Sequence, residues 1–151
     1  MFRFSKKMIF AIEAVVDIAY NGRIDPVQSK EITRRQGIPQ RYLEQVMQQL
    51  VRAGILRGVR GPRGGYFLAK ERRRITVGEI LDVVAALEGS GESGDYESQS
   101  DLGRKVVKPL IDDINRDIME KLDGITVEDL CTEASSSGIQ SEAARKLDFT
   151  I

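Results

Sequence analysis

Residues 55–70 read ILRGVRGPRGGYFLAK, and the prediction of the fold starts from them. Two short runs that suit β-strands, residues 55–60 and 66–70, flank a turn rich in glycine and proline, which is the pattern of a two-stranded hairpin. Arg60 and Arg63 stand at the tip among residues with little side-chain bulk. Both guanidinium groups can therefore enter a narrow groove, whereas a hairpin that only covers a core has no need of them.

The residues before the hairpin predict three helices. Ser5 can cap a first helix with apolar residues at 3.6-residue spacing, which ends near Gly22. Ser29 can cap a short second helix that stops at Gly37, and Pro39 fits the first turn of a third. Two short helices joined by a tight turn and followed by a hairpin are typical of a winged helix-turn-helix. We therefore expect a mainly α fold with a small β-hairpin wing.

Charge is distributed unevenly along the 151 residues. Lys and Arg number 23, as do Asp and Glu, so the formal net charge is zero. Residues 1–75 nevertheless carry 16 basic and 6 acidic side chains, a net charge of +10, while the remainder carries 7 and 17, a net charge of −10. A cationic first half predicts a surface for a polyanion such as double-stranded DNA.

The acidic half predicts a linker and a long amphipathic helix. A capping-box pattern at residues 76–79 opens a helix that completes the DNA-binding domain, residues 1–88. A linker rich in Ser, Gly and acidic residues follows at 89–103. The segment 104–133 should bury its apolar stripe against a second copy in a symmetric dimer, although packing against the first domain is an alternative. We expect residues 134–151 to form a flexible tail. The dimerisation residues would be Val107, Leu110, Ile111, Ile114, Ile118 and Leu122.

Two residue counts exclude most kinds of enzyme. The chain has no histidine and one cysteine, Cys131, so it cannot form a His-dependent triad, a His-ligated zinc site or an intrachain disulfide. No apolar run is long enough to span a membrane and no secretory signal is recognisable, so we expect a cytoplasmic protein. Cys131 is expected to be a small buried hydrophobe, and a redox-sensing thiol is the alternative, which its acidic neighbours disfavour.

Residues 36–45, 50–56, 59–66 and 75–80 together resemble the Rrf-type winged-helix regulators, the family of IscR, NsrR and CymR. The RGPRGGY sequence of the wing is the most specific element, and the resemblance extends to about residue 130. It implies a homodimeric DNA-binding regulator, with repression as the expected role. Members that carry an iron–sulfur cluster have three cysteines in the linker, and this linker has none. The resemblance is therefore to the cluster-less, CymR-like members, and we expect neither a cofactor nor a metal site.

The resemblance also implies which residues contact DNA. The third helix resembles the recognition helix of the family, and Arg, Gln and Glu side chains can read base edges in the major groove. The wing tip should enter the minor groove, and basic residues of the first two helices should contact phosphates. A two-fold dimer would bind a palindromic operator with half-sites about 34 Å apart. The expected contacts are Gln40, Arg41, Glu44 and Gln45 with bases, Tyr42 with a phosphate or the helix start, Arg60, Gly61, Pro62 and Arg63 with the minor groove, and Lys6, Lys7, Arg34 and Arg35 with phosphates.

The chain ends in Asp148, Phe149, Thr150 and Ile151, an ending that resembles the C-terminal tail of serine acetyltransferases. Those tails insert their terminal carboxylate into cysteine synthase (O-acetylserine sulfhydrylase), and CymR-like regulators pair with the same enzyme. The tail is thus expected to bind this synthase and to link the regulator to cysteine metabolism, unless it packs on its own dimer. Two alternatives are a regulator of the same fold that senses a small molecule or a redox signal, and an enzyme-binding interaction protein that does not bind DNA. The basic first half disfavours the second.

Overall fold

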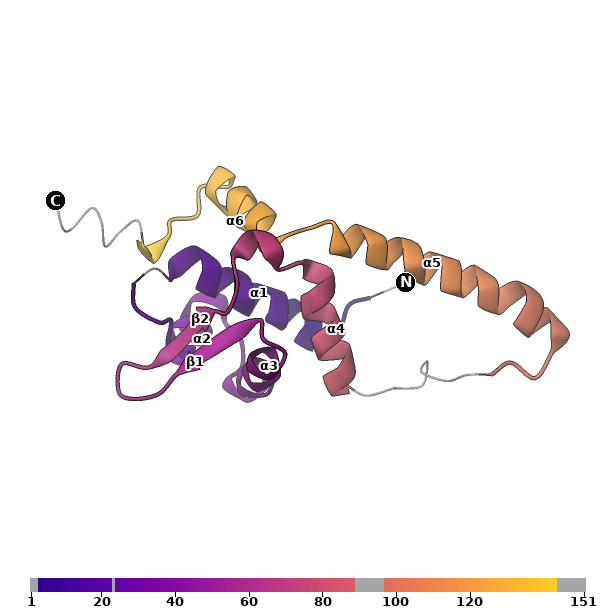
Figure 1. Cartoon of the computed structure of the whole chain (residues 1–151), viewed down its shortest axis with the longest axis horizontal. Coiled ribbons are helices and arrows are strands. Elements are labelled where there is room, and N and C mark those ends of the chain that lie inside the picture. The colour runs from indigo at the N-terminus through magenta and orange to yellow at the C-terminus, as the bar shows by residue number, and fades with distance from the viewer. Residues whose placement is uncertain (1–2, 23, 89–96, 144–151) are drawn as a thin grey trace.

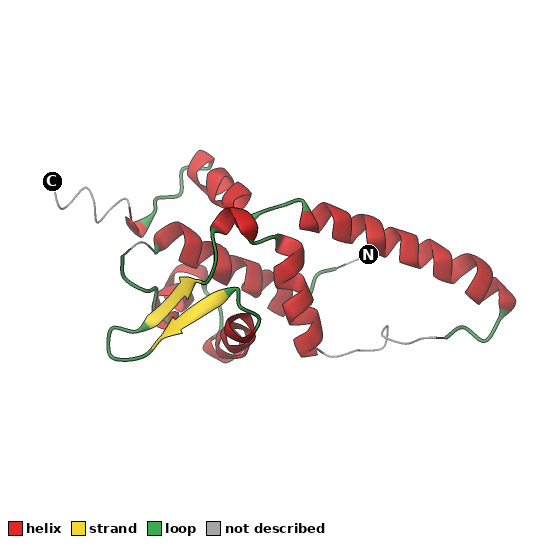
Figure 2. Cartoon of the chain, in the orientation of Figure 1, coloured by secondary structure: helices red, strands yellow, loops and turns green. Residues whose placement is uncertain are grey.

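The computed structural model describes residues 3–22, 24–88 and 97–143 (Figure 1). Figure 2 shows a body of helices with one β-hairpin at its edge and one helix that projects from it. This is the mainly α, winged arrangement that the sequence predicts. The elements within these ranges are α1 (Lys6–Asn21), α2 (Ser29–Gln36), α3 (Gln40–Arg52), β1 (Leu56–Val59), β2 (Gly65–Leu68), a 3₁₀ turn (Arg72–Arg74), α4 (Val77–Glu88), a π-turn (Gly103–Val107), α5 (Lys108–Asp123) and α6 (Val127–Ser136).

The caps of the first helices follow the sequence signals with one exception. Ser5 caps α1, since its Oγ accepts a hydrogen bond from the Met8 N–H at 3.3 Å. The expectation that Ser29 caps α2 is wrong by one residue, because Ser29 is already helical and Gln28 is the cap. The Gln28 N–H donates to the Glu31 carboxylate at 2.9 Å. Gly37 ends α2 in the left-handed region, with φ of 67°.

The wing is shorter than the sequence predicts, and it pairs with a third segment. β1 and β2 are antiparallel, with Gly58 opposite Tyr66. Val27, just before α2, donates its N–H to the Tyr66 carbonyl at 3.0 Å and accepts the Tyr66 N–H at 2.8 Å. A Cβ on Gly65 would lie 2.4 Å from the Val27 carbonyl oxygen, so only glycine allows this approach. These bonds hold the wing to the segment before α2.

One hydrophobic core joins the helices of the body, and α6 packs against it. The Val77 N–H donates to the Ile125 carbonyl at 2.8 Å, and the Val127 N–H donates to the Ile75 carbonyl at 2.9 Å. These bonds place α6 beside α1, where Val127 and Cys131 are buried. The largest fully buried side chains are Ile32, Ile38, Leu43, Met47, Leu50, Ile55, Leu56, Ile75 and Ile80.

The long helix α5 projects from the body (Figure 1). A π-turn lies just before Pro109. Pro109 has no N–H, and its ring would clash with the carbonyl four residues earlier in a regular helix. The π-turn accommodates it through the Lys108 N–H, which donates to the Gly103 carbonyl. The result is a distortion within a continuous helical segment. Among the described residues, every helix is too short or too polar to span a bilayer.

The segment expected to be a flexible tail from residue 134 starts with packed residues. α6 continues to Ser136, and the residues after it contact the end of α1. The Ser141 hydroxyl donates to the Tyr20 carbonyl at 2.6 Å, and the Glu142 N–H donates to Asn21 Oδ1 at 3.0 Å. Residues up to 143 therefore belong to the folded body. Asp148, Phe149, Thr150 and Ile151 lie outside the described residues.

Candidate nucleic-acid interface

One face of α3 is buried and the other carries the residues expected to read bases. Leu43, Val46 and Met47 pack into the core. The helical repeat therefore turns the polar positions outward, and the Gln40 Nε2 donates to Glu44 Oε1 at 3.2 Å. This face offers donors and acceptors for base edges. All four expected residues, Gln40, Arg41, Glu44 and Gln45, are exposed.

Tyr42 lies at the start of α3 and contacts α1. Its ring centroid is 6.0 Å from that of Phe10 and 5.9 Å from the Lys7 Nζ. The Arg41 guanidinium carbon is 4.8 Å from the same ring, and Arg41 Nη2 donates to the Tyr42 hydroxyl at 3.2 Å. Of the two roles that the sequence offered, packing at the helix start is the one seen here. Tyr42 thereby positions two cations, Lys7 and Arg41, at one end of α3.

The tip of the wing is exposed from Arg60 to Arg63. Gly61 has φ of 111°, which favours glycine, and a Cβ on Gly64 would lie 2.2 Å from the Val59 carbonyl oxygen. The tight turn therefore depends on these glycines. Arg57 lies further back on β1, with its guanidinium carbon 5.1 Å from the centre of the Phe67 ring.

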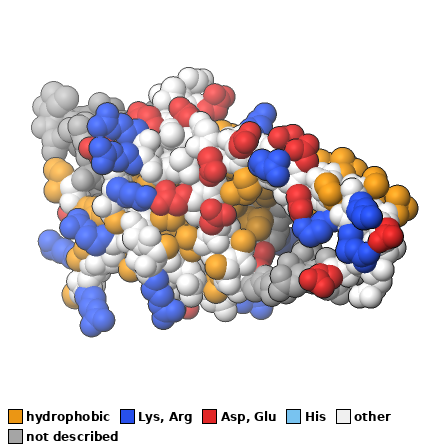
Figure 3. All heavy atoms as spheres, turned by 45° about the vertical axis from the view of Figure 1, so that its right-hand side comes forward, with side chains coloured by type: hydrophobic (Ala, Val, Ile, Leu, Met, Phe, Trp, Pro, Cys, Tyr) orange, Lys and Arg blue, Asp and Glu red, His pale blue; other side chains and the backbone are white. Residues whose placement is uncertain are grey.

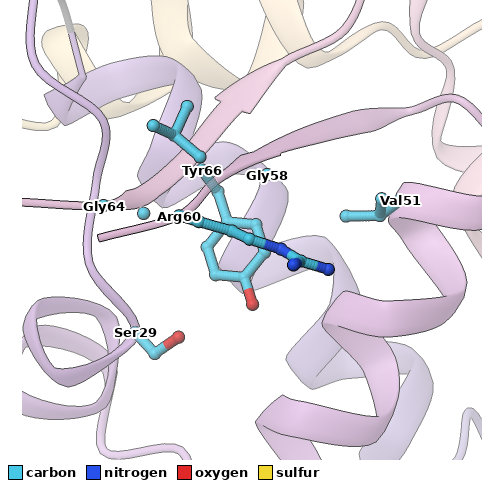
Figure 4. A pocket seen from close by; sticks show the side chains of 8 residues that line it. Ser29, Val51, Gly58, Arg60, Gly64 and Tyr66 are labelled. Atoms are coloured by element: carbon cyan, nitrogen blue, oxygen red, sulfur yellow. The ribbon is translucent and has the colours of Figure 1, made fainter.

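A cleft of about 470 Å³ separates the wing from α2 and α3 (Figure 4). Arg60 and Tyr66 project into it from the hairpin, while Ser29 borders it at the start of α2 and Val51 on α3. The hairpin packs on α1 and α3 through its base, and the cleft leaves open space beside its Arg60 end. The cleft brings a guanidinium and two hydroxyl groups together with the N-terminal end of α2, which are groups that favour phosphate oxygens. Ser29 and Tyr66 were not among the DNA contacts predicted from the sequence, because only folding places the hairpin opposite α2.

The four basic residues expected to contact phosphates do not share one environment. Lys6 and Arg34 are exposed, and Lys7 is half-buried beside Tyr42. Arg35 has a partner within the domain, because its Nε and Nη2 donate to the Asp17 carboxylate at 2.9 and 2.7 Å. The Asp17 hydrogen bond raises the pKa of Arg35. In this structure Arg35 therefore joins α2 to α1.

Asp17 is a residue that sequence reasoning missed. Within the part of the chain that the structure describes, it is the one charged residue buried in the core, and the Gln36 Nε2 donates to it at 2.8 Å in addition to Arg35. The available signal was an acidic residue between Val16 and Ile18, inside the apolar stripe of α1. Three donors offset the cost of burying this carboxylate. The result is a fixed link between α1 and the end of α2, next to the turn that leads to α3.

The other predicted residues lie away from this face. Val107, Leu110, Ile111 and Ile114 are between 44% and 55% exposed on the projecting helix, whereas Ile118 and Leu122 are half-buried. Figure 3 shows basic side chains at the lower left, on the side of the hairpin and α3, and hydrophobic side chains at the right, on the projecting α5. The exposed apolar stripe thus lies on α5, where charged side chains flank it, and not on the hairpin.

Cys131 is buried on α6, beside an ion pair between Arg72 and Glu128. Burial raises the pKa of the Cys131 thiol, while the positive charge of Arg72 lowers it. The net effect is a raised pKa, which keeps the thiol protonated at neutral pH.

Comparisons with known proteins agree with this architecture. A family model described as Rrf2, iron-dependent transcriptional regulator, matches residues 4–133. The HTH-type transcriptional regulators IscR of Escherichia coli O1:K1 / APEC and of Cronobacter sakazakii are each 42% identical over 82 residues, which are 54% of this chain and 51% of theirs. The chain thus spans about half the length of the curated relatives it matches.

Two solved structures are similar over most of the chain. The structure of T. potens IscR has 33% sequence identity and a TM-score of 0.73, and the match covers 93% of both chains. The structure of CymR, the global cysteine regulator of B. subtilis, has 28% identity and a TM-score of 0.66, and the match covers 88% of this chain and 98% of that one. These relatives are transcriptional regulators and not enzymes.

Proposed function

Because the chain belongs to the Rrf2 family of transcriptional regulators, we propose that it is a homodimeric repressor that binds palindromic double-stranded DNA through α3 and the wing. The observation that carries this proposal is the exposed polar face of α3 together with an arginine-tipped wing across an open cleft. Bases in the major groove would be read by Gln40, Arg41, Glu44 and Gln45. The width of the minor groove would be read by Arg60 and Arg63. Lys6, Lys7 and Arg34 would contact phosphates.

The exposed stripe of the projecting helix supports the dimer. Leu110 and Ile111 are 55% and 48% exposed. A continuous apolar face of this kind gains free energy when it is covered, and the same helix of a second copy would cover it with two-fold symmetry. Sedimentation should therefore give twice the mass of the chain, and Ile111→Asp should shift the protein to the monomer.

DNA binding can be tested by fluorescence anisotropy on a duplex selected from a random library. Log K should fall by about 0.9 for each phosphate contact per tenfold rise in salt. Arg60→Ala should weaken binding by about 1–3 kcal/mol, if minor-groove arginines match base-reading pairs in strength, and leave the dimer intact. Arg73→Ala is the matched control and should leave binding unchanged. It also removes one arginine, which lies on the 3₁₀ turn and pairs with Glu71 just before it. Binding that does not depend on salt, or that Arg60→Ala leaves unchanged, would refute the proposal and favour an interaction protein that does not use DNA.

We further propose that the regulated genes concern cysteine and sulfur metabolism. The description of the B. subtilis structure as a global cysteine regulator supports this, as does the resemblance of residues 148–151 to the tail of serine acetyltransferases. Deletion of Ile151 should abolish co-elution with cysteine synthase, while Ser137→Ala, at an exposed position just after α6, should not. If the full chain fails to co-elute, this assignment is wrong.

The family description names iron, and the residues of this chain do not fit a cysteine-ligated cluster. The one cysteine is buried beside Arg72, and the sequence has no histidine. Within residues 3–22, 24–88 and 97–143, no three His, Cys, Asp or Glu side chains gather in a way that could hold a metal ion. We therefore propose that the signal is not carried by such a cluster.

A further inference from the structure

A second cavity lies between α1, α6 and the end of α2, beside the ion pair of Asp17 and Arg35. Its volume is about 500 Å³, within the range of small-molecule sites. Its wall is mainly apolar and is formed by Ile12, Val16 and Tyr20 of α1, Leu130 and Ala134 of α6, and Ile139 after α6. None of the DNA-contact residues discussed above except Arg35 borders it.

The cavity carries one negative charge that the described residues do not balance. Asp17 and Arg35 both border it, but they neutralise each other at 2.7 Å. Glu13 also borders it, and among the described residues it takes part in no hydrogen bond or ion pair. Partial burial raises the pKa of Glu13, so its carboxylate has lost part of its hydration. A cationic group beside it would compensate for that loss.

We propose that this cavity binds a small amphipathic amine, with its apolar body against α1 and α6 and its protonated nitrogen paired with the Glu13 carboxylate. The charge selects a cation over an anion, and the apolar wall selects an alkyl or aromatic amine over a metal ion. Both properties come from residues that the DNA interface does not use.

Binding of a ligand in the cavity would change the position of α3. This extension of the proposal rests on the proposed function. Arg35 and Gln36 form the last turn of α2 and border the cavity, and Gly37 and Pro39 follow before α3 begins at Gln40. A ligand that shifts the Asp17 link therefore acts on the turn that sets the position of α3. A ligand changes DNA affinity only by its differential affinity for the two states.

The binding itself is tested without DNA, by calorimetric titration of the full chain with three probes of similar shape. Phenethylamine should bind saturably with one site per chain, 2-phenylethanol at least tenfold more weakly, and 3-phenylpropanoate not at all. Glu13→Gln should weaken phenethylamine about tenfold, which is about 1.4 kcal/mol, and leave 2-phenylethanol unchanged. Glu133→Gln, at an exposed position of α6 outside the cavity, is the matched control.

Ala134→Phe should fill the cavity and abolish binding of every probe, with circular dichroism to confirm that the variant is folded. Equal affinity for the three probes, no binding of phenethylamine at 10 mM, or unchanged binding in Glu13→Gln would overturn the proposal. If Ala134→Phe changes the sedimentation coefficient instead, a second copy covers the cavity and the proposal also fails. Because these titrations contain no DNA, their outcome is independent of whether the DNA-binding proposal holds, and anisotropy with and without phenethylamine then measures the coupling.

Discussion

Replacing Asp17 by Asn tests whether the buried link between α1 and α2 stabilises the DNA-binding domain. The Asp17 side chain is fully buried and accepts bonds of 2.7, 2.8 and 2.9 Å from Arg35 and Gln36. Asn has nearly the same shape but no charge, so the Arg35 guanidinium would lose its counter-ion. Removing one partner of a buried pair costs about 3–5 kcal/mol, and we expect the lower end because the Arg35 side chain is 15% exposed.

A loss of about 3 kcal/mol should lower Tm by roughly 6–12 °C in a chain of this length. Urea unfolding gives the free energy of unfolding and calorimetry gives Tm. Glu71→Gln is the control, since it removes an acid from a pair with 60% and 69% exposed side chains, and it should change stability by about 0.5 kcal/mol or less. Adding Arg35→Gln to Asp17→Asn should recover part of the loss, because the uncompensated cation is then gone. A loss below about 1 kcal/mol, or strictly additive single changes, would refute this reasoning.

Two further changes test the wing and the buried thiol. Gly65→Ala should lower the free energy of unfolding in urea by about 2 kcal/mol, because its Cβ would displace Val27 and break two backbone hydrogen bonds. Gly58→Ala is the control and should change little, since the nearest atom to its Cβ would be Tyr66 Cε1 at 4.0 Å. Equal effects would contradict the pairing of Val27 with the wing. Alkylation of Cys131 by iodoacetamide, followed by mass spectrometry, should be slower in the native than in the urea-unfolded protein and should accelerate as pH rises, since burial raises the thiol pKa. Arg72→Met should slow the alkylation further, because loss of the cation raises the pKa of Cys131 further. Faster alkylation would show that the Arg72 side chain instead protects the thiol by shielding it from the reagent.

Local signals predicted the helices and the hairpin because each depends on near neighbours in the chain. Ser5 caps α1 and Gly37 ends α2 in the left-handed region, as the residue types indicate. The outward face of α3 follows from helical periodicity. The error at Ser29 arises because the Glu31 carboxylate reaches back to Gln28, and a single-residue preference does not determine which of two adjacent polar residues becomes the cap.

Long-range contacts were not predictable in the same way. The pairing of Val27 with Tyr66, and the return of α6 to the core through Ile75 and Val127, join residues far apart in the chain. Arg35 illustrates the consequence for the site. Its residue type suggested a phosphate contact, and the position of Asp17 in the fold gives it a different partner.

The amino-acid sequence alone determined the kinds of element, their order and the residues available to meet DNA, because periodicity, caps and turn chemistry act over a few residues. The packing of the helices set which charges are buried and paired, where the wing lies relative to α2, and the cavity beside Glu13. The physical reason is that burial and charge pairing depend on distances through space, and residues 13, 35 and 134 come together only when α1, α2 and α6 pack.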